Sequence, residues 1–117
     1  MELRSDSCGL EVALTVIGGK WKPLVLFHLN HGPRRFGELK RLMTGISEKV
    51  LIQQLRELAD DGVVIRQDYQ TVPPKVDYEM TPFGHSLARA LKPLCAWGDE
   101  NRSRIAELQK EAKSTAA

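Results

Sequence analysis

The sequence has 117 residues, of which 42% are hydrophobic and 27% charged, and its formal net charge is +2. This length suits a single domain, and no apolar run approaches the roughly 20 residues that a bilayer-spanning helix needs. The first residues lack the apolar stretch of a secretory signal, so we expect a cytoplasmic protein with no membrane partner.

The first third of the chain predicts two helices. Apolar residues recur at helical spacing over residues 10–17, and a pair of glycines follows this amphipathic segment. The next segment, from Trp21 to about Asn30, is apolar on most sides, so we expect a buried helix there. Gly32-Pro33 ends it, because neither residue favours continued helix.

Residues 36–61 have the outline of a helix-turn-helix. A third helix begins near Phe36, a short turn containing Gly45 follows, and Ser47 is a suitable N-cap for a fourth helix that ends near Asp61. Many other helical hairpins share this outline, so the two helices alone do not define the fold.

The segment after the fourth helix predicts a β-hairpin over about residues 63–80. Val63 and Ile65 are two apart and should point inward on one strand, and apolar residues alternate with acidic ones over 76–80. Between them, Gln67–Lys75 contains a Pro-Pro pair and should form a stiff tip. A helix, turn, helix and hairpin in this order are typical of a winged helix.

A last long helix is expected from about residue 82 to 110. Thr81-Pro82 is a good start signal, and an apolar stripe runs from Phe83 to Trp97. We therefore predict one mainly α domain over residues 1–117 with a small β-hairpin (an α+β winged helix-turn-helix).

Basic residues are concentrated in the predicted helix-turn-helix. Between Arg34 and Arg56 there are six cationic residues and two acidic ones. Such a block favours an anionic partner such as nucleic acid, although any solvated helix surface can carry similar charge.

The fourth helix separates an apolar face from a polar one. If its leucines face inward, Lys49, Gln53 and Arg56 point the opposite way. Lysine and arginine can bind guanine edges or phosphates, and glutamine can bind adenine. The other predicted phosphate contacts are Arg34, Arg35, the helix N-terminus at Ser47, and Lys75 on the hairpin.

Residues that would support catalysis or metal binding do not form a recognisable pattern. The two cysteines, Cys8 and Cys95, and the three histidines lack metal-ligand spacing. The sequence has no glycine-rich phosphate loop and no plausible triad. We expect no catalytic residue, no metal, no cofactor and no enzyme.

Eight short motifs together resemble one family, the HxlR family of winged-helix regulators, which is related to the MarR group. These motifs are Cys8–Glu11, Ile17–Lys22, Gly32–Phe36, Gly45–Ser47, Gln54–Leu58, Asp61–Gly62, Val72–Val76 and Tyr78–Thr81. The resemblance covers about residues 8 to 98; each motif is weak alone, but eight in order are specific.

The resemblance implies a homodimeric repressor of transcription that binds double-stranded DNA at a pseudo-palindromic operator. The first and last helices would form the dimer interface, the helix from Ser47 to Asp61 would enter the major groove, and the wing would lie along the backbone or minor groove. The interface residues expected on the last helix are Leu87, Leu91, Leu94 and Trp97.

The resemblance also points to Cys8, since many family members sense oxidants or electrophiles through a cysteine at this position. Cys8 occupies an N-cap position, where helix amides favour a thiolate, but it can equally be no more than a cap. Gly9 stands where relatives usually carry proline, which loosens that cap. Cys95 is expected to be a packed cysteine.

A small-molecule effector is a further expectation. If one binds, we expect its site between the DNA-binding core and the dimer helices, near the aromatic residues Trp21, Phe27 and Trp97. The alternative is that these three side chains belong to the hydrophobic core. The alternative to all of this is a winged-helix interaction module that binds protein and no DNA.

Overall fold

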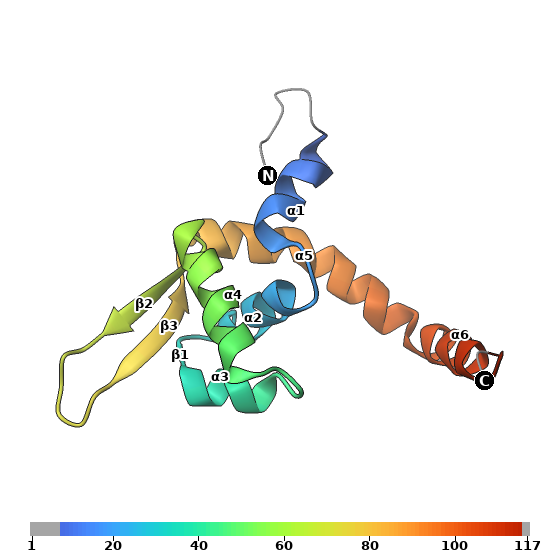
Figure 1. Ribbon diagram of the computed structural model, residues 1–117. Coiled ribbons are helices and arrows are strands. Elements are labelled where there is room, and N and C mark those ends of the chain that lie inside the picture. Colours follow the sequence, from blue (N-terminus) through green and yellow to red (C-terminus); the bar gives the residue numbers. More distant parts are fainter. Residues whose placement is uncertain (1–7, 116–117) are drawn as a thin grey trace.

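The computed structural model describes residues 8–115, which form helices around a small antiparallel sheet (Figure 1). In chain order the elements are α1 (Gly9–Ile17), α2 (Trp21–Leu29), β1 (Arg34–Arg35), α3 (Phe36–Leu42), α4 (Glu48–Asp60), β2 (Val64–Asp68), β3 (Val76–Met80), α5 (Pro82–Glu100) and α6 (Arg102–Thr115). The predicted mainly helical winged helix-turn-helix is confirmed.

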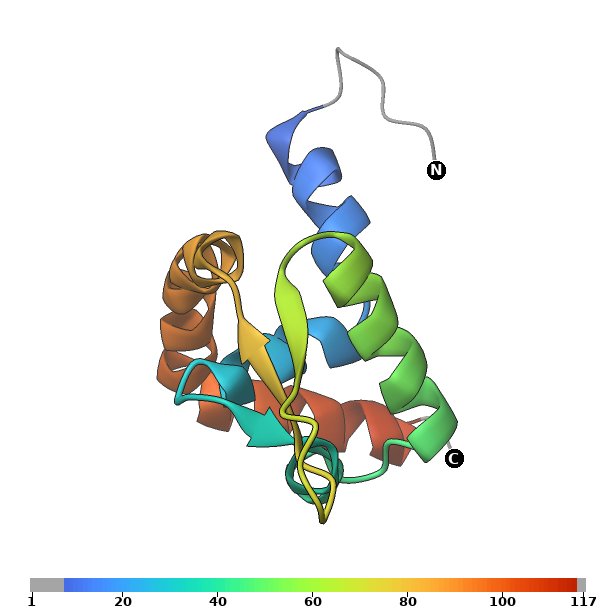
Figure 2. The same ribbon diagram turned by 90° about the vertical axis from the view of Figure 1, so that its left-hand side faces the viewer.

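The sheet has the order β1-β3-β2, so β3 is hydrogen-bonded on both sides. Arg34 pairs with Tyr78 on one side, and Val64 pairs with Met80 on the other. The two-residue strand β1 was not predicted, because so short a segment has no alternation to detect. The β2–β3 hairpin projects from the helical body as the wing (Figures 1 and 2).

The core lies between α2, α3, α4 and the base of the wing. The inner face predicted for α4 is confirmed, since Leu51, Leu55 and Leu58 are all buried. They are joined there by Val25, Leu26, Leu29, Leu39, Met43, Ile46, Val63, Val64 and Met80. Ser47 caps α4 as expected, with its hydroxyl accepting from the backbone N–H of Val50 at 3.1 Å.

The inward residues predicted for the first wing strand are partly wrong. Val63 is buried, but its N–H donates to the carbonyl of Leu58 and it precedes the strand. The strand starts at Val64, whose side chain faces the core on the same side of the sheet as Met80. Side chains alternate from there, so Ile65 faces solvent.

The expectation that α2 is a buried helix holds for one part of its surface and is wrong for the rest. Val25, Leu26 and Leu29 are buried, but Leu24 is partly exposed and Phe27 is 51% exposed. These two side chains face the groove between α2 and α5 instead of the core. The face of α2 that carries Leu24 and Phe27 is therefore not covered by the core.

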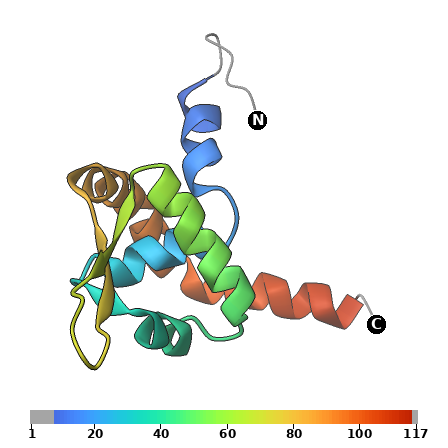
Figure 3. The same ribbon diagram turned by 60° about the vertical axis from the view of Figure 1, so that its left-hand side comes forward.

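The predicted single last helix is broken at Asn101, where α5 ends and α6 begins (Figure 1), and the C-terminal helix extends away from the core (Figure 3). The side-chain amide of Asn101 donates to the carbonyl of Trp97 at 2.9 Å, and the backbone N–H of Asn101 donates to the same oxygen at 3.1 Å. At the other end of α5, Thr81 is the N-cap and Pro82 the first residue, as expected. No single helix within residues 8–115 is long and apolar enough to cross a membrane; α1 and α2 meet that test only as a pair bent by 78°.

Candidate nucleic-acid interface

The outer face of α4 carries the predicted polar stripe. Lys49, Gln53 and Arg56 are exposed and together line a shallow surface hollow, opposite the buried leucines. The same hollow includes Glu48 and Ile52, which the sequence analysis did not single out. Ile52 is an exposed apolar side chain inside a donor-rich patch, suited to an apolar contact such as a thymine methyl group.

Arg34, on β1, contacts both α2 and α3. Its Nε donates to the backbone carbonyl of His28 at 2.9 Å, and its guanidinium lies 3.8 Å from the Glu38 carboxylate. Since His28 is on α2 and Glu38 on α3, Arg34 holds β1 between them. In the free protein this predicted phosphate contact has a structural role that its position in the sequence did not reveal.

Arg35 is also paired within the chain, but its side chain is more open. Its Nε lies 3.9 Å from Asp77 on β3, and its backbone N–H donates to the Glu38 carboxylate at 3.1 Å. The side chain of Arg35 is more than half exposed, whereas Asp77 is nearly buried. The positive charge of Arg35 is therefore exposed at the surface beside α3.

The tip loop of the wing carries Lys75, next to the start of β3, and the apolar residue Val72. The ammonium of Lys75 lies 4.4 Å from the centre of the Tyr69 ring, a cation–π contact across the hairpin. Val72 is 98% exposed, and Arg66 lies 4.0 Å from Asp68. Tyr69 and Val72 are wing residues that the sequence analysis missed, although the neighbouring Pro-Pro pair marked the tip.

His28 is a half-buried residue of α2, and its carbonyl is the one that accepts from Arg34. Burial lowers the pKa of His28 below its ordinary value of 6.5, and the positive charge of Arg34 and the neighbouring His31 lower it further. The ring of Phe27 contacts both histidines edge-on, with centroids 5.2 and 5.6 Å away. Phe27 and His31 also line the groove between α2 and α5, so this cluster lies between Arg34 and that groove.

Both cysteines are exposed free thiols. Cys8 is the N-cap of α1, as predicted, with extended backbone angles, and its carbonyl accepts from the N–H of Val12 at 3.2 Å; its sulfur makes no capping hydrogen bond. The expectation that Cys95 is packed is wrong, because α5 runs beyond the core at this point and Cys95 borders the groove against α2.

The predicted interface residues of α5 fall into two groups. Leu87 and Leu91 are partly buried against the core of their own chain, whereas Leu94 is 64% exposed and Trp97 is also exposed. In α1, which the structure describes in full, Ile17 is the only buried residue. Apolar surface thus remains uncovered on both helices.

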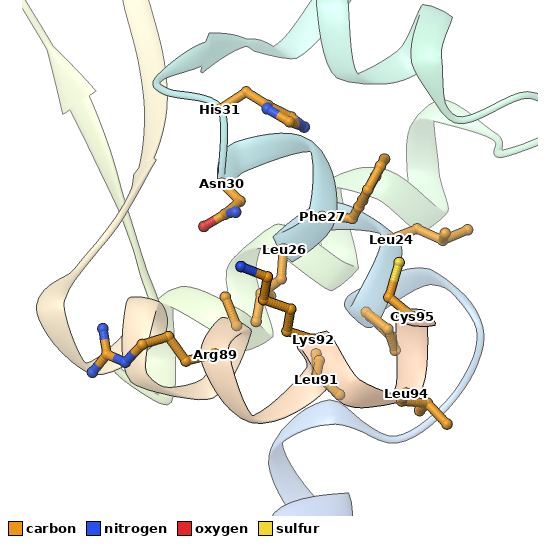
Figure 4. Close-up of a pocket in the computed structure, with 12 residues that line it drawn as sticks. Leu24, Leu26, Phe27, Asn30, His31, Arg89, Leu91, Lys92, Leu94 and Cys95 are labelled. Carbon is orange, nitrogen blue, oxygen red and sulfur yellow. The ribbon is translucent and has the colours of Figure 1, made fainter. Parts of the chain in front are cut away.

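A pocket of about 500 Å³ lies between α2 and α5 (Figure 4). Of the three aromatic residues predicted near an effector site, Phe27 lines this pocket. Trp21 packs against the core instead, and Trp97 lies farther along α5, outside the pocket lining. The described residues contain no cluster of side chains suited to hold a metal ion.

Comparison with known proteins identifies relatives among the helix-turn-helix regulators of transcription. The chain is 51% identical over 105 residues to the Bacillus subtilis (strain 168) HTH-type transcriptional regulator YtcD, covering 90% of this chain and 83% of that protein. The crystal structure of a ytcD regulator superposes with a TM-score of 0.77 at 52% identity, covering 83% of this chain and 99% of the other.

A second solved structure is the redox regulator HypR in its reduced form. It superposes with a TM-score of 0.80 at 41% identity, covering 86% of this chain and 99% of that one. The family model described as HxlR-like helix-turn-helix matches residues 16–106, most of the sequence. The chain therefore belongs to the HxlR-like helix-turn-helix family.

Proposed function

We propose that the protein is a sequence-specific DNA-binding regulator of transcription that acts in the cytoplasm as a homodimeric repressor. The observation that carries the proposal is the outer face of α4, where Lys49, Gln53 and Arg56 lie exposed on one hollow. The buried leucines on the opposite face fix this helix to the core, so its polar side chains are presented on a rigid support.

In this proposal α4 enters the major groove. Arg56 and Lys49 bind guanine edges or phosphates, and the amide of Gln53 binds adenine. The N–H groups at the N-terminus of α4, next to Ser47, donate to a phosphate, and the helix dipole favours negative charge there.

Phosphate contacts to either side set the register on the duplex. Arg35 offers an exposed guanidinium beside α3, and Lys75 offers an ammonium in the tip loop of the wing. Arg34 already contacts Glu38 and the His28 carbonyl within its own chain, so we assign it the smallest share of the binding.

A second copy of the chain covers the exposed apolar residues of α1 and α5. Leu10 on α1 is 68% exposed, and Leu94 and Trp97 on α5 are exposed as well. An isolated helix as short as α1 is marginal in water, since nucleation is costly. A two-fold dimer buries the same patch on both copies and sets two recognition helices about one turn of DNA apart, roughly 34 Å.

Regulation acts through Cys8 or through a small ligand. Cys8 is exposed at the start of α1, within the proposed dimer interface, so its oxidation would change the environment of that helix. HypR, to which the chain is similar, is described as a redox regulator.

The test is a titration of the protein with DNA from its own promoter region, reduced and then diamide-treated, at two salt concentrations. We expect tight binding in the reduced state that weakens steeply with salt, because bound cations are released from the phosphates. Loss of binding on oxidation supports a cysteine switch, and indifference to oxidation leaves a ligand-controlled regulator. A folded dimer that binds no DNA in either state overturns the proposal in favour of a protein-interaction module.

A further inference from the structure

The hollow on the outer face of α4 contains an apolar side chain among polar ones. Of the described residues that line it, Ile52 alone is apolar, and this side chain is 41% exposed. Ile52 lies outside the hydrophobic core, which α4 contacts through the leucines of its opposite face. Its neighbours on the helix surface, three or four residues away along the chain, are Glu48, Lys49 and Arg56. An apolar side chain therefore lies at the centre of a charged surface.

The charged side chains of this hollow are unpaired within residues 8–115. Lys49 and Arg56 form no ion pair with a described residue, and Glu48 forms none either. Their donors and acceptors are therefore free to bind a molecule outside the chain, and such a molecule would also cover Ile52.

The mixture of groups in the hollow fits the edges of bases better than it fits phosphates. Phosphate oxygens only accept hydrogen bonds, so an isoleucine and a carboxylate gain nothing from them. Base edges in the major groove present acceptors, amino donors and, on thymine, a methyl group. The hollow contains a counterpart of each: donors on Lys49, Gln53 and Arg56, an acceptor on Glu48, and apolar surface on Ile52.

We propose that Ile52 is a specificity-determining residue that contacts the methyl group of one thymine in each half-site of the operator. This inference deepens the proposed function and rests on it. Thymine is the base whose major-groove edge carries a methyl group, and its contact with Ile52 removes apolar surface from water on both partners. A cytosine at the same place would instead set its amino group against a side chain that accepts no hydrogen bond.

The test removes the thymine methyl group and leaves the base pair intact. Hydroxyl-radical footprinting of the whole protein on its own promoter DNA first locates the operator, and each thymine in the footprint is then replaced by deoxyuridine, one at a time. We expect one thymine per half-site at which the replacement weakens binding about fourfold, the effect of about one buried carbon group. Replacement in both half-sites should weaken binding by about fifteenfold, since distant positions are roughly additive. Equal affinity for all these DNAs overturns the proposal.

Variants of Ile52 assign the lost contact. Ile52→Ala should bind the thymine and deoxyuridine operators alike, and its affinity should keep the same salt dependence, because no charge is removed. Ile52→Val keeps both γ-carbons and should keep most of the preference for thymine. The matched control is Ile65→Ala, because Ile65 is 42% exposed but lies on β2 of the wing, and this variant should prefer thymine as the unchanged protein does.

The outcomes separate this inference from the proposed function. If Ile52→Ala prefers thymine by the same factor as the unchanged protein, another residue contacts the methyl group and the assignment is wrong. A protein that binds its promoter but does not distinguish thymine from deoxyuridine keeps the proposed function and loses the role of Ile52. A folded dimer that binds no promoter DNA refutes the proposed function, and the role of Ile52 is refuted with it. Circular dichroism checks that each variant is folded.

Discussion

The backbone of Gly84 lies directly against the carbonyl of Val63. A β-carbon at Gly84 would come within 2.1 Å of that oxygen and 3.1 Å of its carbon, so the first turn of α5 can pack there only without a side chain. Thr81, three residues earlier, strengthens the junction with two hydrogen bonds. Its hydroxyl donates to the Gly62 carbonyl at 2.6 Å, and its backbone N–H donates to the Val63 carbonyl at 3.1 Å. The end of α4, the start of the wing and the start of α5 are thus joined at one point.

Gly84→Ala should therefore destabilise the protein by about 1–3 kcal/mol, because the added methyl group must displace backbone. The free energy of unfolding in urea measures this. Gly37→Ala on α3 is the matched control, since its added β-carbon would meet only the end of the Arg41 side chain at 3.6 Å. The control should be neutral or slightly stabilising, and an equal loss in both variants would contradict the role of the Val63 contact.

Arg56→Ala and Lys49→Ala should each weaken DNA binding by about 1–3 kcal/mol while leaving the unfolding midpoint unchanged, because both side chains are exposed on the outer face of α4. Fluorescence anisotropy with promoter DNA measures the affinity. Arg104→Ala on α6 removes a charge of the same sign far from α4 and serves as the control. If all three variants bind alike, the recognition face lies elsewhere.

Leu94→Glu should separate the dimer without unfolding the chain, since the side chain is exposed in the single chain and would be buried between two copies. Sedimentation equilibrium measures the association, and circular dichroism checks the fold. Leu91 is a poorer choice, because it also packs against the core of its own chain. Val72→Glu at the wing tip should remain a dimer; a dimeric Leu94→Glu would place the interface off this part of α5.

The stability of the protein should fall as the pH is lowered below about 6.5, partly through His28. The pKa of His28 is lowered in the folded chain by burial and by Arg34, so below its ordinary value of 6.5 the unfolded chain binds more protons. Urea unfolding between pH 5 and 8 measures the slope. His28→Gln should flatten it, and His85→Gln reports what removal of an exposed histidine does by itself.

Cys8→Ser should bind DNA normally when reduced and keep that binding after diamide treatment. The reason is that serine fits the N-cap position of α1 but cannot form a disulfide or sulfenate. Cys95→Ser is the matched variant, because both thiols are exposed. A Cys8→Ser protein that still releases DNA on oxidation would exclude Cys8 as the sensor.

The elements with strong local signals could be predicted from the sequence, and the exposed face of α4 with them. Its leucines repeat at helical spacing, so Lys49, Gln53 and Arg56 had to point the other way. The family resemblance covered the same region and supplied the order of elements. Features that depend on distant partners were less accessible.

Three errors show why. The strand pattern around Ile65 was read one residue out of register, since pairing with Met80 fixes which residues face the core. The break at Asn101 interrupts an apolar pattern that continues to Leu108, so periodicity alone does not reveal it. The apolar neighbours of Cys95 in the sequence predict a packed side chain, but this part of α5 lies beyond the core.

The sheet order also determines how the protein can associate with itself. With β3 in the centre, the outer edges belong to β1, which is two residues long, and to β2, which carries the charged pair Arg66 and Asp68. Short or charged edges resist the addition of a strand from another molecule. The wing can therefore stand far out from the body without recruiting other wings into larger aggregates, and assembly is left to the helical surfaces.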